Sequence, residues 1–304
     1  MKEVGLAENA INGIENIFGK HSGFRRAHAR GELYEAVFTP SGEVAKWTTA
    51  PHLQKEDTRA FVRFSHFSPN PTWVDIMSPV KGMAVQFQLR GGDITNIVGV
   101  NSPIFFAKTP EAFIEMLRIA KSFTRGKPSL REIKEFVSNY PESKAVIKVL
   151  KKMHAPASFA TGSYHSNHAF YFIDGEGVRS PVKYEWEPAA GMETLSPLEA
   201  MALPIDFYKS DFEDRLASGP VIFQLTIILG EEGDPTDDPT IEWPAERKRI
   251  NAGQLKIQRT IDEVEAVSFD PTIMTDGLAC SEDQILHFRH AAYTISKNRR
   301  TENR

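Results

Sequence analysis

Strand-like and helix-like patterns occupy separate blocks of this chain, and that segregation constrains the fold more than any other feature. Between residues 32 and 90, the stretches "ELYEAVFT", "AFVRFSHF" and "GMAVQFQLR" alternate partly between apolar and polar residues, as half-buried strands do. Helical spacing then runs through residues 109–152, and strand-like stretches return from residue 168. Parallel sheets need strands that alternate with helices, so this order favours an α+β fold built on an antiparallel sheet or barrel.

Start and stop signals place the helices and one hairpin. Thr109 is the expected N-cap of a helix that begins at Pro110, and Ser129 is the expected N-cap of the next one. "HAFYFIDGEGVRSPVKYEWE" has the form of a hairpin around its Gly-containing turn. The closing segment "SEDQILHFRHAAYTISKNRR" has helical spacing, and Ser281 could cap it.

Composition limits the partners and the compartment. The chain has 304 residues, of which 41% are hydrophobic and 25% charged, and its formal net charge is −4. This balance argues against a nucleic-acid partner, which requires a basic surface. The most apolar run, "GPVIFQLTIILG", is too short to span a bilayer, so we expect no membrane partner. Cys280 is the one cysteine, which excludes an intramolecular disulfide and fits a cytoplasmic protein.

His28 lies among arginines in "GFRRAHARGELYEAVF", close to Arg25, Arg26 and Arg30. Nearby positive charge disfavours the charged form of a histidine and lowers its pKa. Such a histidine is neutral near pH 7 and can act as a base. A structural role for a lone histidine is the alternative, and local sequence does not decide between the two.

Two further features could belong to a site. Asn101 precedes a turn and the apolar stretch that contains Phe106, where it could hold a small polar ligand or only satisfy backbone groups. Arg289 and Tyr293 are four residues apart on an expected helix and therefore share a face. A guanidinium beside a phenol stabilises the phenolate, which is a strong donor for ferric iron. A surface arginine–tyrosine stack is the alternative.

Taken in this order, the features resemble the haem catalases. "RRAHARGELYEAVF" is similar to their distal-histidine segment, "FVRFSHF" to the strand that follows it, and "VGVNSPIFFAKTPEAF" to their distal-asparagine segment. "HAFYFIDGEGVRSPVKYEWEP" resembles a later hairpin, and "DQILHFRHAAYTISKNRR" resembles the proximal helix. The separation of 73 residues between His28 and Asn101 also matches the family. The similarity runs from about Gly23 to the end of the chain and implies an antiparallel β-barrel core with surrounding helices.

The resemblance implies a role for each matching residue around haem b (heme b, iron protoporphyrin IX). His28 would be the distal acid and base, Asn101 would orient the peroxide, and Ser65 would hydrogen-bond His28. Tyr293 would be the proximal iron ligand, as in catalases generally, and Arg289 would hold it as the phenolate. The resemblance further implies propionate partners (Arg25, Arg63, Arg300), residues on the distal side of the haem (Phe106, Phe113) and residues behind Arg289 (His168, Asp283). Arg26 and Arg30 are then expected to point to water.

Within this superfamily, the chain is most similar to the small catalase-related haem peroxidases. It lacks the long N-terminal arm and the C-terminal helical domain of full-length catalases, so we expect one haem-binding domain over residues 1–304, with residues 1–22 as a short helical segment. The implied activity is reduction of organic hydroperoxides, and weakly of hydrogen peroxide, through a ferryl intermediate. The implied partners are a hydroperoxide substrate and a small organic electron donor. Without the arm, a homodimer is expected rather than an interlocked tetramer.

Two other functions fit the same scaffold. The first is a hydroperoxide isomerase like the coral allene oxide synthases, in which a threonine lies beside the distal histidine. Ala27 has that place here, which favours the peroxidase. The second is a haem or lipid carrier without enzymatic activity, which would need neither His28 nor Asn101. A barrel protein without haem is a further alternative, which an absorption spectrum would exclude.

Overall fold

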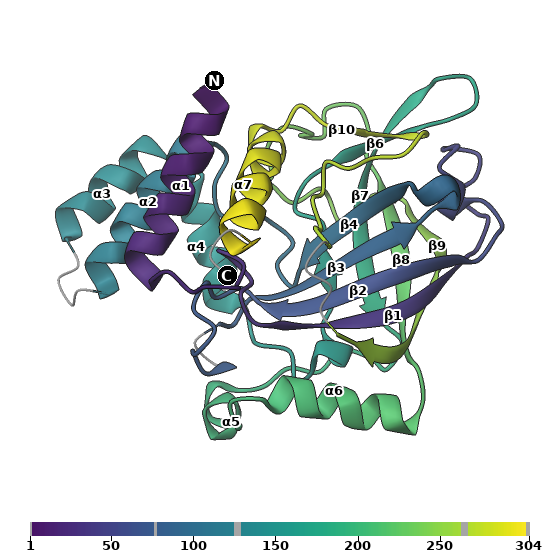
Figure 1. Ribbon diagram of the computed structural model, residues 1–304. Coiled ribbons are helices and arrows are strands. Elements are labelled where there is room, and N and C mark those ends of the chain that lie inside the picture. The colour runs from purple at the N-terminus through teal and green to yellow at the C-terminus, as the bar shows by residue number, and fades with distance from the viewer. Residues whose placement is uncertain (1, 76–77, 125–128, 263–266, 302–304) are drawn as a thin grey trace.

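Ten antiparallel strands form one sheet that closes into a barrel in the computed structural model (Figure 1). The structure describes residues 2–75, 78–124, 129–262 and 267–301. Eight strands follow one another in the order β7-β5-β4-β3-β2-β1-β9-β8, and β8 pairs with β7 to close the ring, while β6 and β10 extend from β7. The antiparallel α+β barrel predicted from the sequence is confirmed. The strands are β1 (Gly31–Pro40), β2 (Thr58–His66), β3 (Lys81–Gln88), β4 (Ile94–Val100), β5 (Tyr164–His165), β6 (Phe170–Ile173), β7 (Arg179–Pro188), β8 (Val221–Leu229), β9 (Arg249–Ile261) and β10 (Leu278–Cys280).

Most of the helices gather on one side of the barrel (Figure 1). There α1 lies against α2 and α7, so the two ends of the described chain pack together. Helices α5 and α6 lie below the barrel in the same view. The α-helices in the described residues are α1 (Lys2–Phe18), α2 (Pro110–Thr124), α3 (Leu130–Asn139), α4 (Ser143–Lys152), α5 (Pro197–Ala202), α6 (Phe207–Ser218) and α7 (Gln284–Thr301). Short 3₁₀ turns occur at Pro51–Leu53, Arg90–Gly92 and Phe159–Thr161.

Side-chain caps fix the starts of α2, α3 and α7. The Thr109 hydroxyl accepts a hydrogen bond from the Ala112 amide, and the Ser129 hydroxyl accepts one from the Glu132 amide, as predicted. For α7, the prediction that Ser281 is the N-cap is wrong. Asp283 directly precedes the helix, and its Oδ1 accepts from the amides of residues 285 and 286 at 2.8 and 3.2 Å. Ser281 lies two positions too early to reach these amides.

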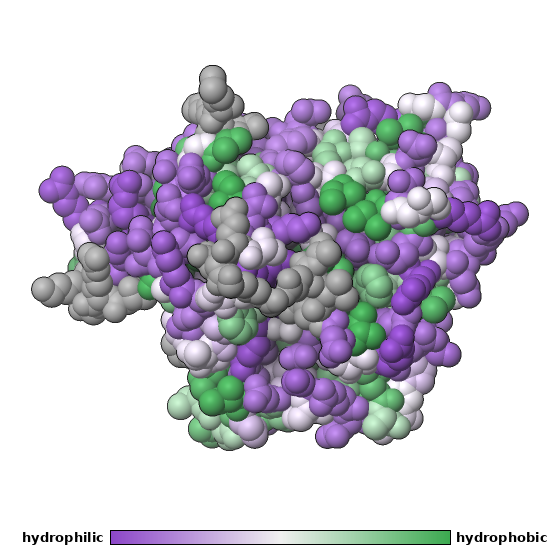
Figure 2. Space-filling model, viewed as in Figure 1, coloured by the Kyte–Doolittle hydropathy of each residue, from purple (hydrophilic) through white to green (hydrophobic). Residues whose placement is uncertain are grey.

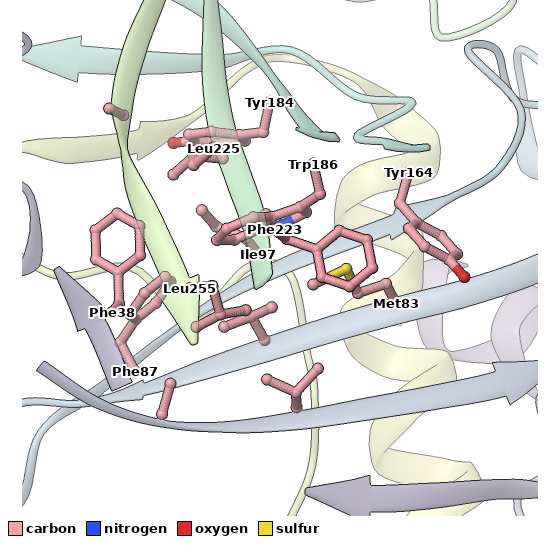
Figure 3. Packing of buried hydrophobic residues seen from close by; sticks show 14 of the residues in the cluster. Phe38, Met83, Phe87, Ile97, Tyr164, Tyr184, Trp186, Phe223, Leu225 and Leu255 are labelled. Atoms are coloured by element: carbon pink, nitrogen blue, oxygen red, sulfur yellow. The ribbon is translucent and has the colours of Figure 1, made fainter. Parts of the chain in front are cut away.

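Aromatic and aliphatic side chains fill the inside of the barrel (Figure 3). Phe38, Phe87, Trp186 and Phe223 are fully buried there, and the Phe38 ring lies 5.3 Å from that of Phe87. Side chains alternate between the two faces of a strand. Residues next to these core positions therefore point out of the barrel, and on β2, β3 and β4 they face the helical layer. A ligand cavity in this molecule has to lie outside the barrel, between its wall and the helical layer.

The surface is mostly hydrophilic in the view of Figure 2, with local apolar groups. One of these lies over α5, where Leu198 and Met201 are exposed. Among the described residues, no helix combines the length and the hydrophobicity needed to cross a membrane.

Candidate active site

A cavity of about 430 Å³ lies between the outer wall of the barrel and the helical layer. This volume is in the range of pockets that bind cofactors and drug-sized ligands. Strands β2, β3 and β4 supply one wall, and α1, α2 and α7 supply the other. The barrel wall contributes Arg63, Ser65, Gly82, Ala84, Val98 and Val100.

His28 enters this cavity from the segment just before β1. Its backbone has φ of 54°, in the left-handed region that non-glycine residues seldom adopt. The His28 amide donates to the carbonyl of Phe67, and its Nδ1 lies 2.9 Å from the Ser65 hydroxyl. Gly82 leaves room for the ring, because a Cβ there would lie 2.8 Å from His28 Cε1. The chain thus holds the imidazole in one orientation with Nε2 left for a ligand.

The environment of His28 keeps it neutral. Burial, followed by the positive charges of Arg63, Arg289 and Arg25, lowers its pKa to about 3. The sequence argument named the charges, whereas burial is the larger cause. A neutral imidazole near pH 7 can accept a proton from a ligand in the cavity.

Tyr293 faces the same cavity from α7, and a chain of polar groups stands behind it. Arg289 Nη2 donates to the Tyr293 hydroxyl oxygen at 2.9 Å, and Arg289 Nη1 donates to His168 Nε2 at 2.9 Å. A guanidinium has donors only, so both of these atoms must accept. His168 Nδ1 must then carry the proton that it donates to Asp283 Oδ2, 2.6 Å away. Burial lowers the pKa of His168, against the opposing effect of Asp283, which agrees with a neutral ring.

Three arginines, Arg25, Arg63 and Arg300, line the cavity and affect one another. Burial lowers the pKa of Arg25 to about 8, with further contributions from Arg63 and Arg300. The pKa of Arg63 is about 10, again through burial first and then through Arg300. Like charges gathered in an apolar cavity fit an anionic ligand that would offset their repulsion. The two carboxylates of a haem meet this requirement.

Aromatic rings form the part of the cavity nearest α2. Phe106 stacks on Phe105 with centroids 4.1 Å apart, and Phe113 stacks on Phe106 at 5.6 Å. Both Phe106 and Phe113 line the cavity, as the sequence comparison expected. Flat apolar surfaces of this kind suit a planar macrocycle.

Asn101 is placed differently from the expectation, and its proposed role has to be corrected. The cavity is lined by Val98 and Val100 of β4, whereas Asn101 is not among the described lining residues. Its amide oxygen accepts from the Lys81 backbone N–H at 2.8 Å, and its amide nitrogen donates to the carbonyl of Pro79 at 3.3 Å. Alternation along the strand explains this, because Val100 points into the cavity and the next residue points away.

Arg26 and Arg30 do not point to water, which corrects a second expectation. Arg26 is buried, and its Nε donates to Glu15 of α1 at 2.7 Å. Arg30 pairs with the buried carboxylate of Asp75. Glu15 and Asp75 are not at helical or strand spacing from the arginines that they pair with, so sequence spacing alone could not reveal these ion pairs. Gly82 and Val100 were also missed, although a glycine within a strand does signal close approach of another group.

Among the described residues, no cluster of three or more His, Cys, Asp or Glu side chains could hold a metal ion by itself. The cavity thus brings together a buried neutral histidine and a tyrosine held by an arginine, on the outside of an antiparallel barrel.

Comparison with known proteins gives the family. The Catalase family pattern matches residues 20–303, so the chain belongs to the catalase family. It is 31% identical to a catalase-related peroxidase of Synechococcus elongatus over 97% of this chain and 88% of that protein. It is 32% identical to a catalase-related peroxidase of Mycolicibacterium paratuberculosis over 97% of this chain and 94% of that protein. The chain is thus an oxidoreductase enzyme of the catalase-related peroxidase kind, and the family implies a haem cofactor.

Solved structures agree on the fold. A fungal catalase superimposes with a TM-score of 0.82 at 18% sequence identity, over 93% of this chain and 60% of the fungal chain. A bacterial catalase superimposes with a TM-score of 0.79 at 23% identity, over 93% of this chain and 58% of the bacterial one. The chain therefore spans somewhat more than half the length of these catalases.

Proposed function

We propose that this protein is a haem b peroxidase that reduces organic hydroperoxides, and weakly hydrogen peroxide, with electrons from a small organic donor. The observation that carries the proposal is one cavity shared by a tyrosine that accepts from Arg289 and by a histidine that is neutral at pH 7. A carrier would need the tyrosine but not a buried neutral base.

The residues of the cavity fit haem in three respects. Tyr293 would hold the iron, with Arg289 stabilising its phenolate by a charge-assisted hydrogen bond. Arg25, Arg63 and Arg300 would bind the two propionates, and Phe106 and Phe113 would cover the ring. When bound, the haem supplies the redox chemistry, while the protein provides orientation and electrostatics.

His28 would move the proton. In its neutral form, Nε2 accepts the proton of the hydroperoxide O–OH group and returns it to the oxygen that leaves as an alcohol. The Ser65 hydroxyl keeps the ring oriented through Nδ1 during both transfers. The overall reaction consumes one hydroperoxide, two electrons and two protons, and yields one alcohol and one water. The electrons come from the organic donor.

Apolar lining favours an organic substrate. Beyond the haem-facing groups, α2 contributes Met116 and Leu117, and α4 contributes Val146 and Val149. Burying an alkyl group against such side chains is favourable, at about 25 cal/mol for each Å² removed from water. Hydrogen peroxide has no apolar group to bury and gains nothing from these contacts.

A turnover assay tests the proposal. Purified protein loaded with haem b is given cumene hydroperoxide, with and without an electron donor such as a phenol. We expect cumyl alcohol in amounts that match the oxidised donor, and a loss of about 10²-fold or more in His28→Gln. Rearranged product from a fatty-acid hydroperoxide without any donor would point to the isomerase instead. Absence of turnover with every peroxide would leave only a carrier and refute the proposal.

A further inference from the structure

We propose that Val100 determines which peroxides this site prefers, because it places an apolar side chain where a hydrogen-bond donor could otherwise stand beside His28. The inference rests on the proposed function and concerns its substrate. It assigns the preference for alkyl hydroperoxides over hydrogen peroxide to one position of β4.

The strand register brings Val100 next to the base. Val100 pairs with Gly82 of β3, and Gly82 is the residue whose backbone lies against the His28 ring. Both Val98 and Val100 face the cavity. Any ligand that gives a proton to His28 Nε2 therefore has an apolar wall close beside it.

The side-chain amides nearest Val100 along the chain and in the cavity lining are hydrogen-bonded to backbone groups. Asn101 is held between the Lys81 amide and the Pro79 carbonyl, and turning it into the cavity would break both hydrogen bonds. Asn167 does line the cavity, but its amide nitrogen donates to the carbonyl of Ser102 at 2.8 Å. The barrel wall around His28 thus presents the imidazole, a serine that is bonded to it, and valines. Arg63 also lies on this wall, where its guanidinium donates to the backbone carbonyls of His28 and Ala29.

The two kinds of peroxide differ in the hydrogen bonds and packing contacts that they can make with this wall. Hydrogen peroxide carries an O–H group at each end, so a correct angle requires a polar partner for both oxygens. An alkyl hydroperoxide has a single O–H group for His28, and its carbon end can pack against Val100. The wall therefore orients alkyl hydroperoxides by packing and leaves hydrogen peroxide poorly oriented.

The experiment measures the ratio of kcat/KM for cumene hydroperoxide to kcat/KM for hydrogen peroxide in the haem-loaded protein. Val100→Asn and the isosteric Val100→Thr add a donor, whereas Val100→Ala only removes bulk. We expect the ratio to fall about tenfold or more in the Asn variant and less in the Thr variant. Binding of fluoride, followed by the absorption spectrum, should tighten in both and not in Val100→Ala.

Asn101→Ala tests whether the Asn101 amide orients the peroxide or only binds the backbone of Lys81 and Pro79. If Asn101 has only its backbone contacts, this variant keeps the wild-type ratio once its haem content is matched. A selective loss of hydrogen peroxide turnover in Asn101→Ala would overturn the inference. An unchanged ratio and unchanged fluoride affinity in Val100→Asn and Val100→Thr would overturn it too. Failure of the proposed function looks different, because the wild-type protein would then show no donor-dependent turnover at all.

Discussion

Tyr293 and His28 reach the cavity from different elements, and polar partners fix the direction of each. For Tyr293 the partner is Arg289, which is itself held by His168 and Asp283. For His28 the partner is Ser65, and Gly82 has no side chain to occupy the space of the ring. Chemistry at this site thus depends on a few contacts whose loss should be measurable one residue at a time.

The replacement Gly82→Ala should displace His28. The added Cβ would lie 2.8 Å from Cε1, 2.9 Å from Nδ1 and 3.0 Å from the Ser65 hydroxyl oxygen, which forces the ring to move. We expect kcat/KM for cumene hydroperoxide to fall about 10²-fold, with the haem spectrum retained. Gly175→Ala is the matched control, because nothing lies within 4 Å of its added Cβ. Wild-type activity in Gly82→Ala would show that the ring position is not critical.

The pH dependence of turnover should have no acid limb from His28 near neutrality. Its pKa is lowered to about 3, so the base is neutral above that value and is lost only as the pH falls toward it. We expect kcat/KM to stay level between about pH 5 and pH 8. A limb close to pH 6.5 that disappears in His28→Gln would mean that the imidazole has its ordinary pKa in the working enzyme.

At the scale of elements, ion pairs connect α1 to α7 and to the segment that carries His28. Glu15 pairs with Arg26 at 2.7 Å and with Arg299 of α7 at 2.9 Å, and the Glu15 side chain is only 4% exposed. Helix α1 also lines the cavity through Ile11 and Ile14. The N-terminal helix is therefore part of the cavity wall, and its Glu15 carboxylate links it to α7.

Removing the Glu15 charge should lower the free energy of unfolding. Glu15→Gln leaves the buried Arg26 guanidinium without its anionic partner, so we expect a loss of about 3–5 kcal/mol in the free energy of unfolding. Glu8 approaches the same Arg299 at 3.9 Å but is exposed. Glu8→Gln should therefore cost about 0–1 kcal/mol in the same urea titration. Equal effects of the two variants would contradict the role given to the buried pair.

The sequence predicted elements better than contacts. Strand alternation and capping residues located the barrel strands, the hairpin and the helices, because these are local properties of the chain. Asn101 was misassigned because the similarity of "VGVNSPIFF" to a distal-asparagine segment does not show which residue at the end of β4 faces the cavity. Glu15 and Asp75 were missed as partners of Arg26 and Arg30 because long-range ion pairs leave no periodic trace. The polar set Asp283, His168 and Arg289 was anticipated through the family resemblance, and spacing alone did not predict it.

On the scale of the whole molecule, the filled barrel acts as a rigid wall for a cavity that lies outside it. The filling includes polar atoms without a hydrogen bond among the described residues, and both ring nitrogens of the buried His52 are among them. His52 packs against Phe87 at 4.3 Å, and burial lowers its pKa to about 3. Such a histidine stays neutral in the folded barrel and takes up a proton when the chain unfolds in acid.

This histidine should make the fold sensitive to acid. Its folded pKa is below the ordinary 6.5, so its contribution to stability is complete above pH 6.5 and is lost as the pH falls toward 3. His52→Phe should reduce the slope of unfolding free energy against pH by about 1.4 kcal/mol per unit in that window. It should also add about 1–3 kcal/mol at pH 7 by removing buried polar atoms without partners. His52→Gln should reduce the slope without that gain, and an unchanged slope in both would contradict the assignment.

The central claim is that the Tyr293 oxygen, held by Arg289, binds the iron of a haem in this cavity. The most direct measurement is the absorption spectrum of ferric protein reconstituted with haem b, compared between wild type, Tyr293→Phe and the control Tyr140→Phe. Tyr140 is a partly buried tyrosine that is not among the described residues lining the cavity. We expect wild type and the control to share one phenolate-ligated spectrum, whereas Tyr293→Phe should lose that spectrum or fail to retain haem. Haem bound by Tyr293→Phe with the wild-type spectrum would contradict the account.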